Sequence, residues 1–200
     1  SFVSRGLGDV YKRQPLLILT LVFTGCSDDD DPTPDPVNEQ EVITLVTVEM
    51  TNQENGETVT FSWGDPDYGL DGYDGPSSIA PVPHSCVINA YNTTLDPSDE
   101  EYVVTNEILE EDLDHQFFFS SAPSDLISNF EYLDNDSEGN PIGQIFEIQP
   151  SADQAGNSGT FTVLLIHEPE KNNEGVSSGD PTNAAGETDF ELTWSFAWGN

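Results

Sequence analysis

Three histidines and one internal cysteine are the residues of this chain best suited to bind a transition metal. His84 and Cys86 lie two residues apart, and His115 and His167 flank β-rich runs elsewhere in the chain. Imidazole and thiolate are ligands that zinc and copper prefer. No CxxC or HExxH motif groups such residues locally, so the fold would have to assemble a site. The alternative interpretation is that these are strand-end histidines hydrogen-bonded to their neighbours.

One acidic turn offers oxygen ligands of the kind that calcium prefers. The segment DNDSEGN places Asp134, Asp136 and Glu138 at alternate positions, followed by Gly139, as at the start of a calcium-binding loop. The match ends there, because Ile145 occupies the twelfth position, where such a loop has a bidentate glutamate. Two interpretations stay open: a weak Ca²⁺ site, or a hairpin turn that is acidic because the whole chain is acidic.

Motifs of the common enzyme classes are missing from the sequence. There is no G-x-S-x-G, P-loop or Rossmann fingerprint, and carboxylates are too abundant for any pair to indicate glycoside hydrolysis. Trp63, Trp194 and Trp198 alternate with other apolar residues, which favours core packing over a sugar-binding platform. We therefore expect a protein without enzymatic activity.

The charge of the chain is strongly one-sided. It has 38 Asp and Glu residues against four Lys and Arg, and a net charge of −34. Phosphate backbones are repelled by such a surface, so we exclude nucleic acid as a partner, whereas soluble cations are attracted.

The N-terminal part has the composition of processing and anchoring segments. Residues 1–14 resemble translated adapter or vector sequence, because the only methionine is Met50. Residues 15–25 are apolar but shorter than the roughly 20 residues that span a bilayer. The sequence FTGC resembles the lipobox of bacterial lipoproteins, which implies cleavage before Cys26 and acylation of its thiol; two or three acyl chains anchor a protein stably. Residues 26–41, with three prolines and seven acids, predict an extended tether.

From residue 42 onward the apolar residues recur with the period of two that is typical of β-strands. The last run, DFELTWSFAW, places Phe190, Leu192, Trp194, Phe196 and Trp198 on one face. Turns rich in Gly, Asn and Asp separate about eight such runs. We predict that residues 42–200 form a single all-β domain, an antiparallel β-sandwich of about eight strands. One short helical connection is expected within DPSDEEYVVTNEILEEDLDH.

Three segments resemble a family of small flavobacterial surface lipoproteins that are often labelled "type 1 periplasmic binding fold superfamily protein". They are EEDLDHQFFF, YLDNDSEGNPIG and HEPEKNNEGVSSGDPTNAAGETDFELTW. Type 1 periplasmic binding proteins are longer, two-lobed α/β structures, so our fold prediction rests on the strand pattern. The resemblance implies a lipoprotein of the cell envelope. His115 and His167 lie in its first and last segments, and they are our candidate transition-metal pair.

Together these features predict an outer-membrane lipoprotein. The acidic residues that follow Cys26 resemble the surface-export signal of Bacteroidetes lipoproteins. This resemblance implies that the protein is exposed at the cell surface. The alternative is the periplasmic face of the outer membrane. We expect a non-enzymatic binding or accessory module that captures a cation or small ligand for an outer-membrane importer or another envelope protein. The alternative is a structural or adhesive surface protein that binds glycan or protein.

Overall fold

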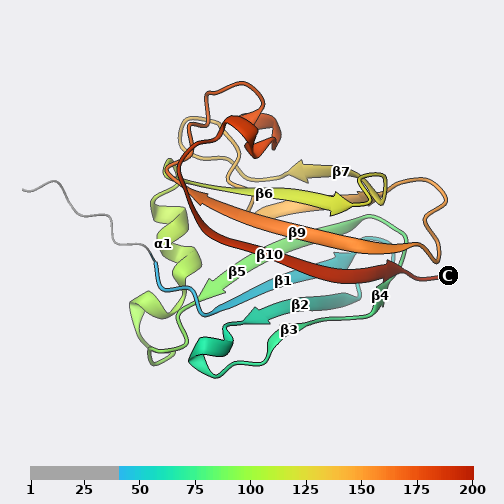
Figure 1. The fold of residues 1–200 in the computed structure, drawn as a ribbon, viewed down its shortest axis with the longest axis horizontal. Helices are drawn as coiled ribbons and strands as arrows, with labels where there is room; N and C mark the ends of the chain where they lie inside the picture. The colour runs from blue at the N-terminus through green and yellow to red at the C-terminus, as the bar shows by residue number, and fades with distance from the viewer. Residues whose placement is uncertain (1–40) are drawn as a thin grey trace, which may run out of the picture. The chain divides into compact units, whose positions relative to one another are not determined.

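The computed structural model describes residues 41–200, which belong to one folded unit, Glu39–Asn200 (Figure 1). The adapter-like segment, the apolar segment, Cys26 and the predicted tether up to residue 40 lie outside the described residues. Within residues 41–200, no helix is both long enough and apolar enough to cross a membrane.

Two sheets face each other, with the order β3–β2–β1–β5–β8–β7 in the first and β4–β10–β9–β6 in the second (Figure 1). The first contains β1 (Leu45–Asn52), β2 (Thr58–Gly64), β3 (Gly72–Asp74), β5 (His84–Tyr91), β7 (Ile127–Tyr132) and β8 (Ile145–Pro150). The second contains β4 (Ser78–Ile79), β6 (His115–Ala122), β9 (Ser158–His167) and β10 (Glu187–Trp198). The predicted β-sandwich is confirmed. It has ten strands rather than eight because β3 and β4 are too short to leave a periodic pattern.

The helical connection is α1 (Val104–Glu110), which lies between β5 and β6 and packs against β5. Its buried residues are Val104, Thr105 and Ile108, and the Thr105 hydroxyl accepts a hydrogen bond from the Ala90 amide at 2.6 Å. The described chain also has the 3₁₀ turns η1 (Pro66–Tyr68), η2 (Glu100–Tyr102), η3 (Val176–Ser178) and η4 (Pro181–Asn183).

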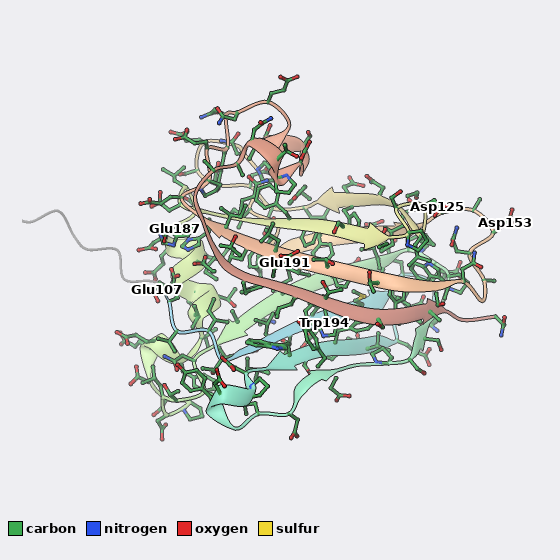
Figure 2. All side chains as sticks on the ribbon, in the orientation of Figure 1. Glu107, Asp125, Asp153, Glu187, Glu191 and Trp194 are labelled. Atoms are coloured by element: carbon green, nitrogen blue, oxygen red, sulfur yellow. The ribbon has the colours of Figure 1, made fainter. Side chains whose placement is uncertain are left out.

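The main core lies between the sheets, and β10 contributes every second side chain to it. Trp194 and Trp198 are 2% and 1% exposed, whereas Glu191 of the same strand is exposed (Figure 2). Trp194 Nε1 donates to the carbonyl oxygen of Ser62 in the opposite sheet at 2.8 Å. These tryptophans are therefore core residues, as the alternation predicted.

A smaller core covers part of the outer face of the second sheet. It consists of Phe118, Ile166, Val176 and Ala184, so the long connection from β9 to β10 folds back onto the sheet. Gln116 Nε2 donates to the Val176 carbonyl oxygen at 2.9 Å and fastens this connection. The connection matters for the site below, because it sets where β9 ends and where β10 begins.

Candidate metal centre

Four side chains with metal-ligating groups meet at one end of the second sheet. His115 is the first residue of β6, and His167 is the last residue of β9. Glu41 precedes β1, and Asp189 lies near the start of β10. One ligand atom from each of these four residues lies within 4.8 Å of the other three.

The pairing of β6 with β9 brings the two imidazoles together. His115 and His167 are direct partners in this antiparallel pair, and their ring centroids are 4.6 Å apart. Directly opposed residues have Cβ atoms only about 4.5–5.5 Å apart. The register is held by apolar pairs further along the strands, such as Phe117 with Leu165, because a slip of one residue would turn these buried side chains out of the core.

A β-bulge directs Asp189 inward. The pairing of β10 with β9 shifts between Thr188 and Phe190, which leaves Asp189 as the extra residue. In a regular strand the residue before buried Phe190 points to the outer face, as Glu191 does. Because a bulge interrupts this alternation, the Asp189 side chain is instead only 1% exposed.

Gly186 allows the start of β10 to approach the end of β9. Its φ is +73°, and a Cβ at this position would lie 2.2 Å from the carbonyl oxygen of His167. Only glycine avoids both the left-handed strain and the collision. This close approach keeps the bulge at Asp189 beside the histidine pair.

We expect Gly186→Ala to lower the free energy of unfolding by about 1–3 kcal/mol more than Gly56→Ala, because of the added overpacking. Gly56 is the matched control, since its φ is +76° and no atom lies within 4 Å of a Cβ there. Urea denaturation of both variants measures the difference. Equal losses would show that the approach to His167 is unimportant.

The four side chains are withdrawn from water. Their exposed fractions are 0% for His115, 1% for Asp189, 2% for Glu41 and 11% for His167. His115 Nε2 lies 3.1 Å from Glu41 Oε1 and 3.9 Å from Asp189 Oδ2, and His167 Nδ1 lies 3.7 Å from Glu41 Oε2. Tetrahedral coordination with bonds of about 2.0–2.2 Å requires ligand separations of about 3.3–3.6 Å. The four ligand atoms lie within 4.8 Å of one another, so they would have to draw closer together to form a tetrahedral shell.

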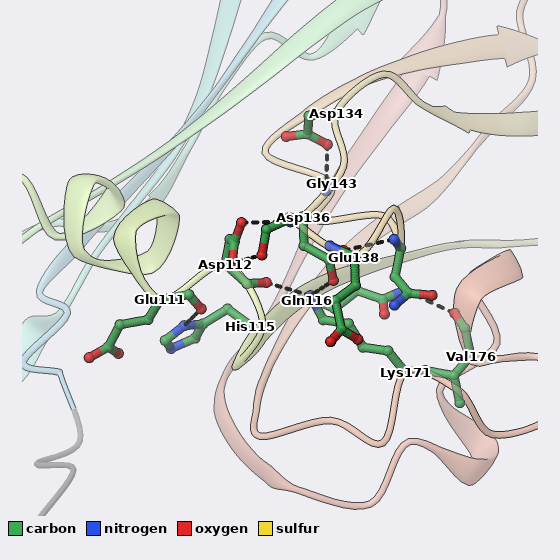
Figure 3. Close-up of polar contacts among 12 residues, drawn as sticks. Glu111, Asp112, His115, Gln116, Asp134, Asp136, Glu138, Gly143, Lys171 and Val176 are labelled. Atoms are coloured by element: carbon green, nitrogen blue, oxygen red, sulfur yellow. Dashed lines mark hydrogen bonds and ion pairs between the residues drawn. The ribbon is translucent and has the colours of Figure 1, made fainter. Parts of the chain in front are cut away.

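The proton on His115 is placed by the turn that precedes β6. His115 Nδ1 lies 3.3 Å from the backbone carbonyl oxygen of Glu111 (Figure 3). A carbonyl oxygen only accepts, so Nδ1 carries a proton, and Nε2 faces the carboxylates. In the neutral ring this tautomer offers the Nε2 lone pair to a metal ion, the arrangement that second-shell carbonyls commonly impose.

The directions of the pKa shifts indicate that the carboxylates of the cluster stabilise a positive charge on His115. Burial lowers the pKa of His115, but the hydrogen bond and charge of Glu41, aided by the Glu111 carbonyl and Asp189, outweigh burial and raise the pKa above its ordinary value. Burial alone would raise the pKa of the Glu41 carboxyl group. The hydrogen bond with His115 helps to bring that pKa below its usual value. A proton on His115 or a bound cation would satisfy the same negative charge.

Further acids lie close to the cluster. The pKa of Glu107 on α1 is raised by burial and then by the negative charges of Glu41, Glu111 and Glu101. The Glu111 Oε2 atom is buried, and no hydrogen-bond partner for it occurs in residues 41–200. These acids add negative charge around the two carboxylates of the cluster, which favours cations over anions.

The structure brings together the predicted pair His115 and His167 and adds two ligands that the sequence analysis missed. Glu41 was assigned to the tether, but it is the first described residue and its carboxylate is buried in the cluster. Asp189 was treated as part of a regular strand. Neither had a sequence signal, because a bulge and a contact between distant segments leave no periodic pattern.

His84 and Cys86 do not belong to the cluster. His84 Nδ1 donates to the Val82 carbonyl oxygen at 2.8 Å, and its ring packs near Trp198 in the core. Cys86 is fully buried in the main core, where burial raises the pKa of its thiol far above the ordinary value. The interpretation of a histidine hydrogen-bonded to its neighbours fits His84.

In the predicted calcium turn, Asp134 is bonded to the backbone of its own hairpin (Figure 3). Its Oδ1 accepts from the Gly143 amide at 2.7 Å, and its Oδ2 accepts from the Ile145 amide at 2.9 Å. Both oxygens therefore hold the turn closed.

Asp136 has a similar structural role. Its Oδ1 accepts from the amides of Glu138 and Asn140 at 3.0 and 2.8 Å, and its Oδ2 pairs with Lys171 Nζ at 2.9 Å. Glu138 is exposed. Within the described part of the chain, Asp134, Asp136 and Glu138 do not form a cluster of converging ligand atoms. These contacts favour the hairpin interpretation, and calcium binding here stays a prediction.

The geometry thus defines one buried group of two imidazoles and two carboxylates, assembled from four separate parts of the chain. Comparisons of the chain with protein-family models, with curated proteins and with solved structures find no match.

Proposed function

We propose that this domain is a binding module for a divalent transition-metal ion of the Zn²⁺ class. The supporting observation is the convergence of ligand atoms from Glu41, His115, His167 and Asp189 within 4.8 Å. Two carboxylates and two neutral imidazoles carry two negative charges, which a divalent ion neutralises in a buried site. Imidazole ligands favour zinc, copper, nickel or iron, whereas calcium and magnesium prefer oxygen ligands alone.

The number of protein ligands supports a binding function without catalysis. Structural zinc sites are closed by four protein ligands, whereas catalytic zinc sites have three and keep a position for water. Four side chains converge here, and all are buried or nearly buried. A metal held in this way has no open coordination position for a substrate.

Calorimetric titration of the metal-free protein tests this proposal. We expect one Zn²⁺ ion to bind per chain and Ca²⁺ in excess to leave that binding unchanged. His115→Ala should abolish the binding event. Absence of Zn²⁺ binding to the wild-type protein would refute the proposal, and so would unchanged binding by His115→Ala.

We also propose that the domain is held at the outer membrane through Cys26, at the cell surface, where it serves as a cation-binding accessory module of an outer-membrane importer or another envelope protein. Support comes from the lipobox-like FTGC, the acidic segment after it and the net charge of −34. A strongly acidic surface attracts and concentrates cations near the membrane.

Replacing Cys26 by Ser is expected to abolish lipid attachment. When the full chain is expressed in a bacterial host with labelled palmitate, the wild-type protein should carry label and partition into detergent. Cys26→Ser should lose both properties, and Cys86→Ala should retain them, because Cys86 is buried in the core. Labelled palmitate on the Cys26→Ser variant, or an unlabelled wild-type protein, would contradict lipidation at Cys26.

A further inference from the structure

The outer edge of β10 is open for most of its length. On one side β10 pairs with β9 from Glu187 to Ala197. On the other side only Ala197 and Trp198 pair, with the two-residue strand β4. Within the described chain, no strand pairs with this outer edge before Ala197. An open strand edge presents backbone donors and acceptors to any extended chain that reaches it.

The bonds at the paired end show which groups face outward. Ala197 and Gly199 donate their amides to β4 and its neighbour Ser77, whereas the Trp198 amide bonds on the β9 side, to Asn157. Bonds of an antiparallel strand alternate between its two edges. The amides of Thr193 and Ser195 therefore point outward as well.

Only a weak side-chain contact occupies this edge at its centre. The Thr193 amide lies 3.5 Å from the Tyr73 hydroxyl, a distance at the outer limit for a hydrogen bond. The hydroxyl stands where the carbonyl oxygen of a neighbouring strand would be. A strand with a better-placed carbonyl can replace it at little cost.

A surface hollow of about 340 Å³ lies along the same edge. Its lining includes Tyr73 and Asp74 of β3, Phe61 of β2 and Trp194 of β10. The rings of Phe61 and Trp194 are almost fully buried, and Tyr73, which is 52% exposed, packs edge-on against Trp194 at 5.7 Å. The exposed lining of the hollow is therefore mainly polar, with the Tyr73 ring as its accessible aromatic group, and it lies next to open backbone groups.

The charge of the edge determines what kind of chain fits it. Asp74 lies in the hollow, and Glu191 is exposed on β10 (Figure 2). In residues 41–200 the only Lys or Arg is Lys171, which is buried against Asp136. Nothing in this domain balances the acids of the hollow, so the complementary partner is basic. A second copy of this acidic domain would be repelled.

We propose that the outer edge of β10 binds an extended, basic segment of another protein, which adds to the second sheet as a further strand. Its backbone would pair with Thr193 and Ser195, and alternate side chains would enter the hollow, the two components of recognition by strand addition. Lysine or arginine side chains would meet Asp74 and Glu191. This surface uses no residue of the metal cluster, so it is independent of the proposed metal binding.

The test uses the full chain and labelled peptides in a fluorescence-polarisation titration. The probe is a nine-residue peptide of alternating valine and lysine. A second peptide of the same sequence carries N-methyl groups on alternate residues, which keeps its charge but blocks strand pairing. We expect the first peptide to bind at least about tenfold more tightly than the second, since the methylated peptide loses the backbone hydrogen bonds to the edge of β10. Equal binding would mean general electrostatic attraction and would overturn the proposal.

Charge reversal locates the binding surface. Glu191→Lys should weaken binding of the unmodified peptide about tenfold, whereas Glu49→Lys should change it less than about twofold, because Glu49 is exposed on a strand of the other sheet. If the two variants weakened binding equally, the peptide would not bind at the edge of β10, and the proposal would be overturned. Binding of a glycan in the hollow, with no peptide binding, would replace the proposal with a sugar-binding one.

Discussion

Zn²⁺ is expected to raise the melting temperature of the metal-free protein by about 5–10 °C. A ligand that binds only the folded state adds about 2.7 kcal/mol of stability at 100 times its dissociation constant. For a domain of this size, 1 kcal/mol shifts the melting temperature by about 2–4 °C. The effect should be strong, because the ion would join Glu41, near the start of the folded unit, to Asp189, near its end. Differential scanning calorimetry with and without chelator measures it.

Two matched variants separate the cluster from the acidic surface. Glu41→Gln removes a ligand and should lose most of the shift. Glu49→Gln makes the same chemical change at an exposed position of β1 and should keep the full shift. A shift of equal size in both variants would mean that Zn²⁺ stabilises the protein through surface carboxylates.

The size of the Zn²⁺ effect should depend on pH. A metal ion must displace the proton from His115 Nε2, and the raised pKa of His115 makes that proton compete at a higher pH than in an ordinary histidine. In metal-free protein, the stability due to protonated His115 is fully present below the unfolded pKa and is lost as pH rises through the raised folded pKa. As pH rises between the unfolded and the folded pKa of His115, protonated His115 should contribute less to the melting temperature of the metal-free protein. Over the same pH range, the rise in melting temperature that Zn²⁺ causes should become larger. An increment that shrinks with rising pH would contradict a role of His115 as ligand.

Replacing Lys171 by Met is expected to cost about 3–5 kcal/mol of stability, the usual effect of leaving a buried charge without its partner. Lys171 Nζ donates to Asp136 Oδ2 at 2.9 Å and to the Asp112 carbonyl oxygen at 2.6 Å, and its side chain is 5% exposed. This contact joins the connection after β9 to the acidic turn before β8 (Figure 3). Urea denaturation of Lys171→Met at neutral pH measures the loss.

A double variant and a pH series check that the loss comes from the charge on Asp136. Asp136→Asn combined with Lys171→Met should recover part of the stability, because no buried charge remains. Burial raises the pKa of Asp136, but Lys171 and the turn amides outweigh burial and lower it. The stability from this pair is therefore present above the unfolded pKa and is lost as pH falls through the lowered folded pKa. The difference between wild type and Lys171→Met should narrow in acid, and a constant difference would point to lost packing.

The strands that carry the core were predictable from the sequence because their information is local. In β10, burial of Phe190, Leu192, Trp194, Phe196 and Trp198 follows directly from the alternation of apolar and polar residues. The short strands β3 and β4 have no such alternation, and they form only because neighbouring strands offer an edge. Leu109 and Leu113 show the limit of periodicity. They lie at helical spacing but stay 39% and 43% exposed. The helix α1 buries Val104, Thr105 and Ile108 instead of Leu109, and it ends at Glu110, before Leu113.

By itself, the sequence determined the two-layer β architecture, the acidic surface and the residue types that can bind a metal, since each depends on composition or on neighbours along the chain. Only the tertiary structure decided which of these residues meet. The register of β6 with β9 places His115 against His167, a single bulge turns Asp189 inward, and the segment before β1 brings Glu41 to the same place. Such contacts depend on pairing and packing between segments about 20 to more than 70 residues apart along the chain, and no local pattern records them.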